Sequence, residues 1–65
     1  MLISQIKQRR MEKHLSQREF AELLNISHVQ LCRYEKGHAY PSLPVLFDME
    51  NILQCTLNDL FKKIN

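Results

Sequence analysis

Two helix-start signals of the same kind stand close together in this chain of 65 residues. In the first, Ser16–Glu19 (SQRE), the Ser16 hydroxyl can accept from the Glu19 backbone N–H while the Glu19 carboxylate reaches back. The second, Ser27–Gln30 (SHVQ), follows only two residues after the first helix ends, and Asn25 between them tolerates the left-handed backbone that terminates helices. The sequence therefore predicts two short helices joined by a tight turn.

Capping residues and apolar spacing divide the whole chain into five predicted helices. The first two cover about Leu2 to Lys13 and Gln17 to Leu24, with apolar sets Leu2, Ile3 and Ile6, and then Phe20, Ala21, Leu23 and Leu24. The third ends at about Lys36, where Gly37 is the sole glycine of the chain. The fourth starts after Ser42 with Pro44 in its first turn, and a short fifth opens at Thr56 with the apolar set Leu57, Leu60, Phe61 and Ile64. We expect a compact all-α fold in one domain, residues 1–65.

Composition excludes several classes of protein. Hydrophobic residues make up 45% and charged residues 25%, as in ordinary globular domains. A chain this short buries only about 60% of its unfolded surface, which leaves little core for a catalytic pocket, and we predict no enzyme. No segment approaches the roughly 18 apolar residues of a membrane helix, and no signal peptide is evident. Cys32 and Cys55 fit no zinc-finger spacing, so we expect reduced thiols in a cytoplasmic protein without a cofactor.

The charge is distributed unevenly along the chain. Residues 1–38 hold seven Lys and Arg against four Glu, a net charge of +3. Residues 39–65 hold two Lys against three acidic residues, a net charge of −1. This asymmetry is compatible with one basic face that meets an anionic polymer, and equally with a solvated surface.

The third helix has two chemically different sides. At 100° per residue, Leu31 and Tyr34 fall on one side and are expected to anchor the helix in the core. The opposite arc contains no acidic residue and consists of His28, Val29, Cys32, Arg33 and Lys36. An anionic groove would accept such a set, whereas a structural outer face more often includes Glu or Asp.

Four side chains of this arc can be interpreted either as DNA contacts or as ordinary surface residues. Arg33 can donate two parallel hydrogen bonds to guanine O6 and N7, and Val29 can contact a thymine methyl group. His28 in the first turn can donate to a base or a phosphate, and Lys36 is expected to contact phosphate. Alternatively, all four are solvated surface residues. His28 and Cys32 have metal-ligand spacing but supply only two ligands, so we predict no metal site.

Residues along most of the chain, from about Ile6 to Phe61, resemble the lambda-repressor-like, Cro/repressor-type helix-turn-helix domains. The resemblance is carried by Leu15-Ser16-Gln17, Phe20-Ala21-x-x-Leu24, Asn25-Ile26-Ser27, Leu31, Tyr34-Glu35-x-Gly37, Pro41-Ser42 and Leu60-Phe61. It implies a five-helix fold in which the second and third helices form the helix-turn-helix and the third reads DNA in the major groove.

The resemblance also implies roles for individual residues. His28, Val29 and Arg33 occupy the base-reading positions of the third helix, and Gln17 occupies the place of a Gln that contacts phosphate. An Arg of the first helix pairs with a Glu near the end of the third in several members, and Arg10 and Glu35 match this structural ion pair. The complete set of expected phosphate contacts is Gln17, Arg18, Ser27, Lys36 and His38.

These observations predict a sequence-specific, double-stranded DNA-binding transcriptional regulator. The resemblance implies that the protein binds a palindromic operator as a two-fold homodimer. We expect neither a small-molecule substrate nor association with a membrane. The candidate dimer surface is the fifth helix and the loop before it, with Cys55, Leu57, Asn58, Phe61 and Ile64. The alternative is a protein-binding helical module, for example an antitoxin-like partner.

Overall fold

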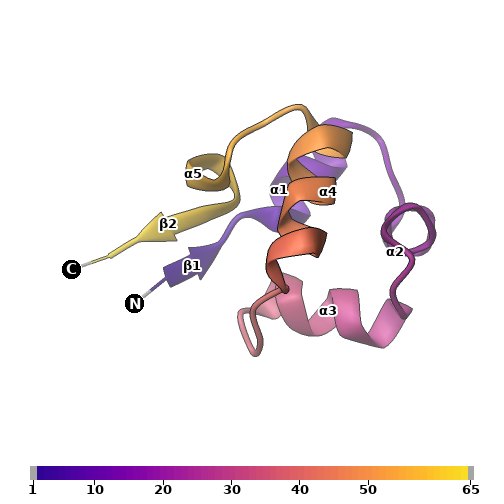
Figure 1. Cartoon of the computed structure of the whole chain (residues 1–65), viewed down its shortest axis with the longest axis horizontal. Helices are drawn as coiled ribbons and strands as arrows, with labels where there is room; N and C mark the ends of the chain where they lie inside the picture. The colour runs from indigo at the N-terminus through magenta and orange to yellow at the C-terminus, as the bar shows by residue number, and fades with distance from the viewer. Residues whose placement is uncertain (1, 65) are drawn as a thin grey trace.

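The computed structural model describes residues 2–64, which form five helices and a two-stranded sheet (Figure 1). The elements follow in the order β1 (Leu2–Ser4), α1 (Ile6–Glu12), α2 (Gln17–Leu24), α3 (His28–Lys36), α4 (Leu43–Leu53), α5 (Leu57–Leu60) and β2 (Phe61–Lys63). The five helices expected from the sequence are therefore present.

The short sheet joins the two ends of the chain, and it corrects the expected bounds of the first and fifth helices. β1 and β2 pair antiparallel, with Leu2 opposite Lys63 and Ser4 opposite Phe61. The first helix starts at Ile6 rather than Leu2, and the fifth ends at Leu60 instead of continuing to Ile64. The strand pairing forms backbone hydrogen bonds in place of those that a helix would form. Because the two strands are distant in sequence, the local spacing of apolar residues does not indicate this pairing.

All five helices contribute side chains to one apolar core. Its buried members are Ile6, Phe20, Ala21, Leu24, Leu31, Tyr34, Met49, Leu53 and Leu60. Leu23 was expected among them, but its side chain is 57% exposed. Leu23 lies 60° beyond Phe20 around α2, outside the stripe that Phe20, Ala21 and Leu24 present to the core. A helix of eight residues that packs through one narrow stripe leaves its flanks in solvent.

Within residues 2–64, four residues adopt the left-handed backbone conformation, and each follows one of the helices α1 to α4. Asn25 (φ 56°) and Gly37 (φ 78°) terminate α2 and α3, as predicted. His14 and Gln54 adopt the same conformation after α1 and α4, which their residue types did not indicate. The Ile26 N–H donates to the Ala21 carbonyl at 3.1 Å, which fixes the turn between α2 and α3.

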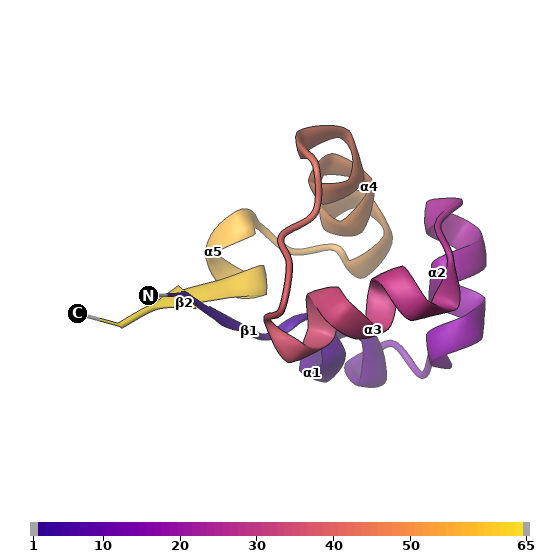
Figure 2. The same ribbon diagram turned by 90° about the horizontal axis from the view of Figure 1, so that it is seen from below.

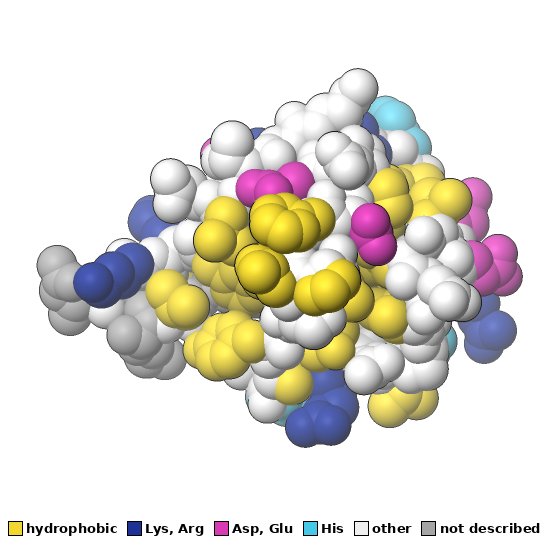
Figure 3. Space-filling view, in the orientation of Figure 1, with side chains coloured by type: hydrophobic (Ala, Val, Ile, Leu, Met, Phe, Trp, Pro, Cys, Tyr) yellow, Lys and Arg dark blue, Asp and Glu magenta, His cyan; other side chains and the backbone are white. Residues whose placement is uncertain are grey.

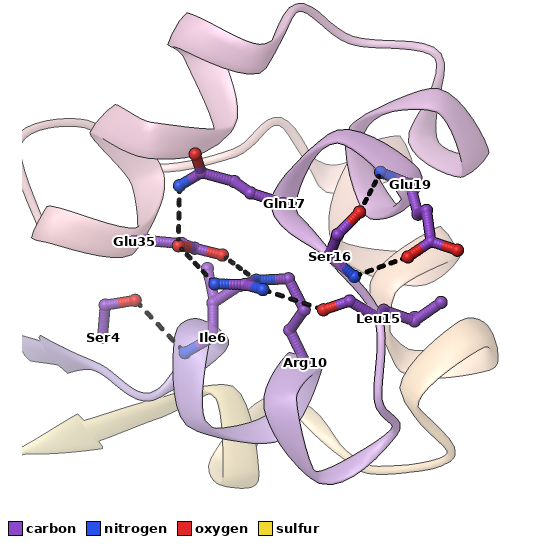
Figure 4. Close-up of polar contacts among 8 residues, drawn as sticks. All are labelled: Ser4, Ile6, Arg10, Leu15, Ser16, Gln17, Glu19 and Glu35. Carbon is purple, nitrogen blue, oxygen red and sulfur yellow. Dashed lines mark hydrogen bonds and ion pairs between the residues drawn. The ribbon is translucent and has the colours of Figure 1, made fainter.

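The first capping box forms both of its hydrogen bonds, and the second forms one. The Glu19 N–H donates to Ser16 Oγ at 3.0 Å, and Glu19 Oε1 accepts from the Ser16 N–H at 2.9 Å (Figure 4). Ser27 Oγ accepts from the Gln30 N–H at 3.0 Å. Within residues 2–64, Gln30 returns no hydrogen bond to Ser27.

The Ser16–Glu19 box predicts a dependence of stability on pH. The hydrogen bonds from the Ser16 backbone and side chain hold the pKa of Glu19 below its ordinary value. Because the folded-state pKa is the lower one, the stabilisation is complete above the unfolded-state pKa of about 4.3 and is lost as pH falls through the folded-state pKa. In urea titrations at pH 7 down to 3, Glu19→Gln should flatten this acid decline. Glu22→Gln on the same helix, outside the capping box, is the control, and equal slopes in all three proteins would contradict the assignment.

Candidate nucleic-acid interface

The turn at Asn25–Ser27 sets α2 and α3 at a steep angle and leaves one side of α3 uncovered. In Figure 1, α3 runs along the lower edge of the molecule, with α1, α2 and α4 above it. Viewed from below, α3 lies in front of the other helices along its length (Figure 2). Leu31 and Tyr34 are buried and fix its inner side to the core, so its outer side is presented in a defined orientation.

The outer side of α3 carries the side chains that the sequence assigned to it. His28, Val29, Arg33 and Lys36 are all exposed, and Val29 is 68% exposed. We call these four residues the α3 strip. Cys32, which was expected in the same arc, is half-buried. The strip is therefore basic and polar around one exposed valine.

Other candidate contacts lie beside the two helix starts and beyond the end of α3. Arg18 in the first turn of α2, Ser27 before α3, and His38 after it are exposed. The His38 N–H donates to the Arg33 carbonyl at 2.9 Å, which holds this loop against the last turn of α3. Among the residues that the structure describes, Arg18, Arg33 and Lys36 form no ion pair. Their positive charges are therefore available to bind an external anion.

Behind the strip, a buried ion pair joins α1 to α3. Arg10 Nε donates to Glu35 Oε2 at 2.7 Å, and a second guanidinium nitrogen lies 3.4 Å from Glu35 Oε1 (Figure 4). The side chains of Arg10 and Glu35 are 9% and 4% exposed. Arg10 also donates to the Leu15 carbonyl at 2.8 Å, so the pair braces the corner between α1 and α2 as well.

Gln17 belongs to the same hydrogen-bonded network, which sequence reasoning did not anticipate. Its side-chain amide donates to Glu35 Oε1 at 3.0 Å and the residue is half-buried (Figure 4). This bond uses one amide N–H and leaves the second N–H and the amide oxygen of Gln17 for another partner. No local spacing could have revealed it, because Gln17 and Glu35 come from different helices.

The described part of the chain contains no cluster of metal-binding side chains. Residues 2–64 contain no group of three or more His, Cys, Asp or Glu side chains placed to hold a metal ion. His28 and Cys32 remain an isolated pair, short of the three or four ligands of a tetrahedral site.

None of the helices within residues 2–64 has the length and apolar character needed to cross a membrane.

Comparison with known proteins agrees with this geometry. A family model described as Helix-turn-helix matches residues 6–60. The HTH-type transcriptional regulator DicA of Escherichia coli (strain K12) is 37% identical over 51 residues, which cover 78% of this chain and 38% of the relative. The chain thus spans well under half the length of that relative. These matches confirm the resemblance read from the sequence: the chain belongs to the Cro/XRE-type helix-turn-helix family, a family of non-enzymatic DNA-binding domains.

Proposed function

We propose that this domain recognises a specific sequence of double-stranded DNA by inserting α3 into the major groove, and that it regulates transcription as a two-fold dimer. The observation that carries the proposal is the α3 strip, whose exposed residues include no acid and face away from the core. The major groove is about 12 Å wide and admits an α-helix with its side chains. The similarity to DicA, a transcriptional regulator, supports the regulatory part.

In this proposal, three residues of the strip read base edges. His28 and Val29 in the first turn of α3 reach the groove floor, and Arg33 follows one turn later on the same side. Arg33 donates two hydrogen bonds to guanine, and Val29 packs on a thymine methyl group. His28 donates to a base acceptor.

Phosphate contacts on either side of α3 hold it in the groove. Gln17 and Arg18 lie at the start of α2, where the helix dipole favours an anion. Ser27 precedes α3, and Lys36 and His38 lie at its far end. The contacts therefore bracket the base-reading residues, and they fix the register of the domain on the duplex without reading sequence themselves.

Gln17→Ala is expected to weaken binding to all DNA sequences by a similar factor, because a phosphate contact is independent of base identity. The measurement compares dissociation constants for a selected site and for unrelated duplexes. Gln8→Ala, an exposed glutamine of α1, is the matched control. A loss confined to one base position would contradict the phosphate role of Gln17.

The experiment that tests the proposed function is a selection from random duplex DNA at low salt. We expect an enriched inverted repeat whose half-sites lie about one helical turn, or about 34 Å, apart. Affinity should then fall linearly on a log–log plot against salt, with a slope of about −2 per protomer from Arg18 and Lys36 alone. Failure to enrich any sequence, or an affinity indifferent to salt, would overturn the proposal.

A further inference from the structure

The carboxylate of Glu35 connects the buried ion pair to a residue of the proposed DNA interface. Glu35 Oε2 accepts from Arg10 Nε at 2.7 Å, and Glu35 Oε1 accepts from the Gln17 amide at 3.0 Å (Figure 4). The side chains of Arg10 and Glu35 are buried, whereas Gln17 is half-buried. One hydrogen-bonded chain therefore links α1, α3 and α2, and it runs from the core to the surface.

The hydrogen bond to Glu35 decides which way the Gln17 amide faces. A carboxylate paired with arginine only accepts hydrogen bonds, so the NH2 group of Gln17 faces Glu35 and the amide oxygen faces away. Figure 4 shows the amide oxygen of Gln17 directed away from Glu35. One N–H is used in this bond, and the second N–H of the same nitrogen is held in a fixed direction beside it.

The fixed amide lies at the start of α2, where other hydrogen-bond donors are available. The Ser16 hydroxyl accepts from the Glu19 N–H, which leaves the backbone N–H groups of Gln17 and Arg18 without an intrahelical partner. The helix dipole adds a partial positive charge at the same place. An amide that is already held beside these groups can contact a phosphate without rearranging.

The negative charge of Glu35 is hidden from an approaching anion. Figure 3 shows basic side chains along the lower edge of the molecule, where α3 runs in Figure 1, and the acidic side chains visible in this view lie above and to the right of that edge. An unpaired carboxylate behind Gln17 would repel a phosphate. Because the guanidinium of Arg10 balances this charge, Glu35 can hold the amide without weakening the interface.

A side chain that is fixed before binding contributes more to affinity than a mobile one. A free glutamine side chain populates several rotamers, and ordering it on binding lowers affinity by about 2- to 10-fold. The hydrogen bond to Glu35 restricts Gln17 in the free protein, before DNA arrives. The contact of Gln17 with a phosphate then loses less conformational entropy.

We propose that Glu35 is a positioning residue for DNA binding, which holds the amide of Gln17 ready for a phosphate while Arg10 holds Glu35. Both Arg10 and Glu35 are buried, so they act on DNA only through Gln17. The inference rests on the proposed function, because the phosphate contact of Gln17 is part of that function.

The anchoring of Gln17 is measured first in the wild-type chain without DNA. Nuclear magnetic resonance relaxation of the side-chain amide nitrogens gives an order parameter for each glutamine. We expect the value for Gln17 to lie closer to the rigid value of about 0.85 than to the flexible limit of about 0.6. Gln8, an exposed glutamine of α1, should fall below that limit. A Gln17 amide as mobile as that of Gln8 would overturn the proposal.

A double-mutant cycle then tests whether the anchoring contributes to DNA binding. Gln17→Ala is made in the wild type and in Arg10→Met/Glu35→Leu, a background that removes the carboxylate and leaves no buried charge unpaired. Gln17→Ala should weaken binding to the selected site about 10-fold in the wild type, and less than about 5-fold in this background, because an unanchored amide contributes less. Two effects that multiply to within about 2-fold are independent, and that result would overturn the proposal.

Arg18→Ala is the matched control in both backgrounds. Arg18 follows Gln17 in the first turn of α2, is exposed and forms no ion pair within residues 2–64. Its effect on affinity should be the same in the wild type and in Arg10→Met/Glu35→Leu, with circular dichroism showing that each variant is folded. If the effects of Gln17→Ala and Arg18→Ala shrank together, the background would have shifted α2 as a whole, and the positioning role would be wrong.

The outcomes separate this inference from the proposed function. A wild-type chain that selects no DNA sequence would remove the proposed function, and the role of Gln17 with it. A wild-type chain that selects a sequence, but in which the substitutions at Gln17 and at the ion pair act independently, would remove the positioning role of Glu35 alone.

Discussion

Glu35→Gln is expected to lower the free energy of unfolding by about 3–5 kcal/mol, the usual penalty for breaking a buried ion pair from one side. The side chain of Glu35 is 4% exposed and accepts hydrogen bonds from both Arg10 and Gln17. Without its carboxylate, the buried guanidinium of Arg10 loses its counter-charge. Because a domain of this size has about 3–10 kcal/mol of stability in total, this one substitution should unfold a large fraction of the molecules.

Urea denaturation followed by circular dichroism measures this loss. Glu22→Gln, an exposed glutamate of α2, is the control and should shift the free energy of unfolding by less than about 0.5 kcal/mol. Replacing both partners, as in Arg10→Met with Glu35→Leu, should recover much of the stability, because no buried charge is then left unpaired. A Glu35→Gln protein as stable as the control would show that the pair contributes nothing.

Arg33→Ala is expected to reduce affinity for the selected DNA site by about 1–3 kcal/mol per half-site, or roughly 5- to 150-fold. Arg33 is exposed in the middle of the α3 strip and forms no ion pair within residues 2–64. Truncation should therefore remove the proposed contact with a base without disturbing the core. The preference at one base pair of each half-site should relax, while the preferences read by His28 and Val29 remain.

Arg33→Lys separates base reading from simple attraction to phosphate. Lys keeps the positive charge but cannot present two parallel donors to guanine. It should therefore preserve the salt dependence of binding and still lose the preference at that base pair. If Arg33→Lys retained full sequence preference, or if Arg33→Ala left both affinity and preference intact, Arg33 would not read a base.

The parts of the fold that were predictable are those fixed by neighbouring residues. The bounds of α2 follow from the Ser16–Glu19 box and from Asn25, and the end of α3 follows from Gly37, because caps act within one turn. The sheet was missed because Leu2 pairs with Lys63 across the whole chain. Leu23 was misplaced because apolar character alone does not say how wide a stripe the neighbouring helices cover.

The candidate site also has features that could be predicted from neighbouring residues and features that could not. A helical wheel was sufficient to separate the exposed α3 strip from Leu31 and Tyr34, since the period of the helix decides which side is covered. The hydrogen bond between Gln17 and Glu35 depends on how α1, α2 and α3 meet, which is tertiary geometry. The contacts of the strip with bases and phosphates stay predictions, because they depend on a DNA molecule.

The pairing of β1 with β2 brings Leu2 and Lys63 to within one strand spacing of each other. A short peptide linker could therefore join them into a covalent circle without moving a helix. Such a circle would raise the melting temperature by restricting the unfolded chain, as a cross-link does. α3 contacts β1, but the joined ends leave the exposed side chains of the α3 strip unchanged. The circular protein should therefore bind the same DNA after heating that unfolds the linear one.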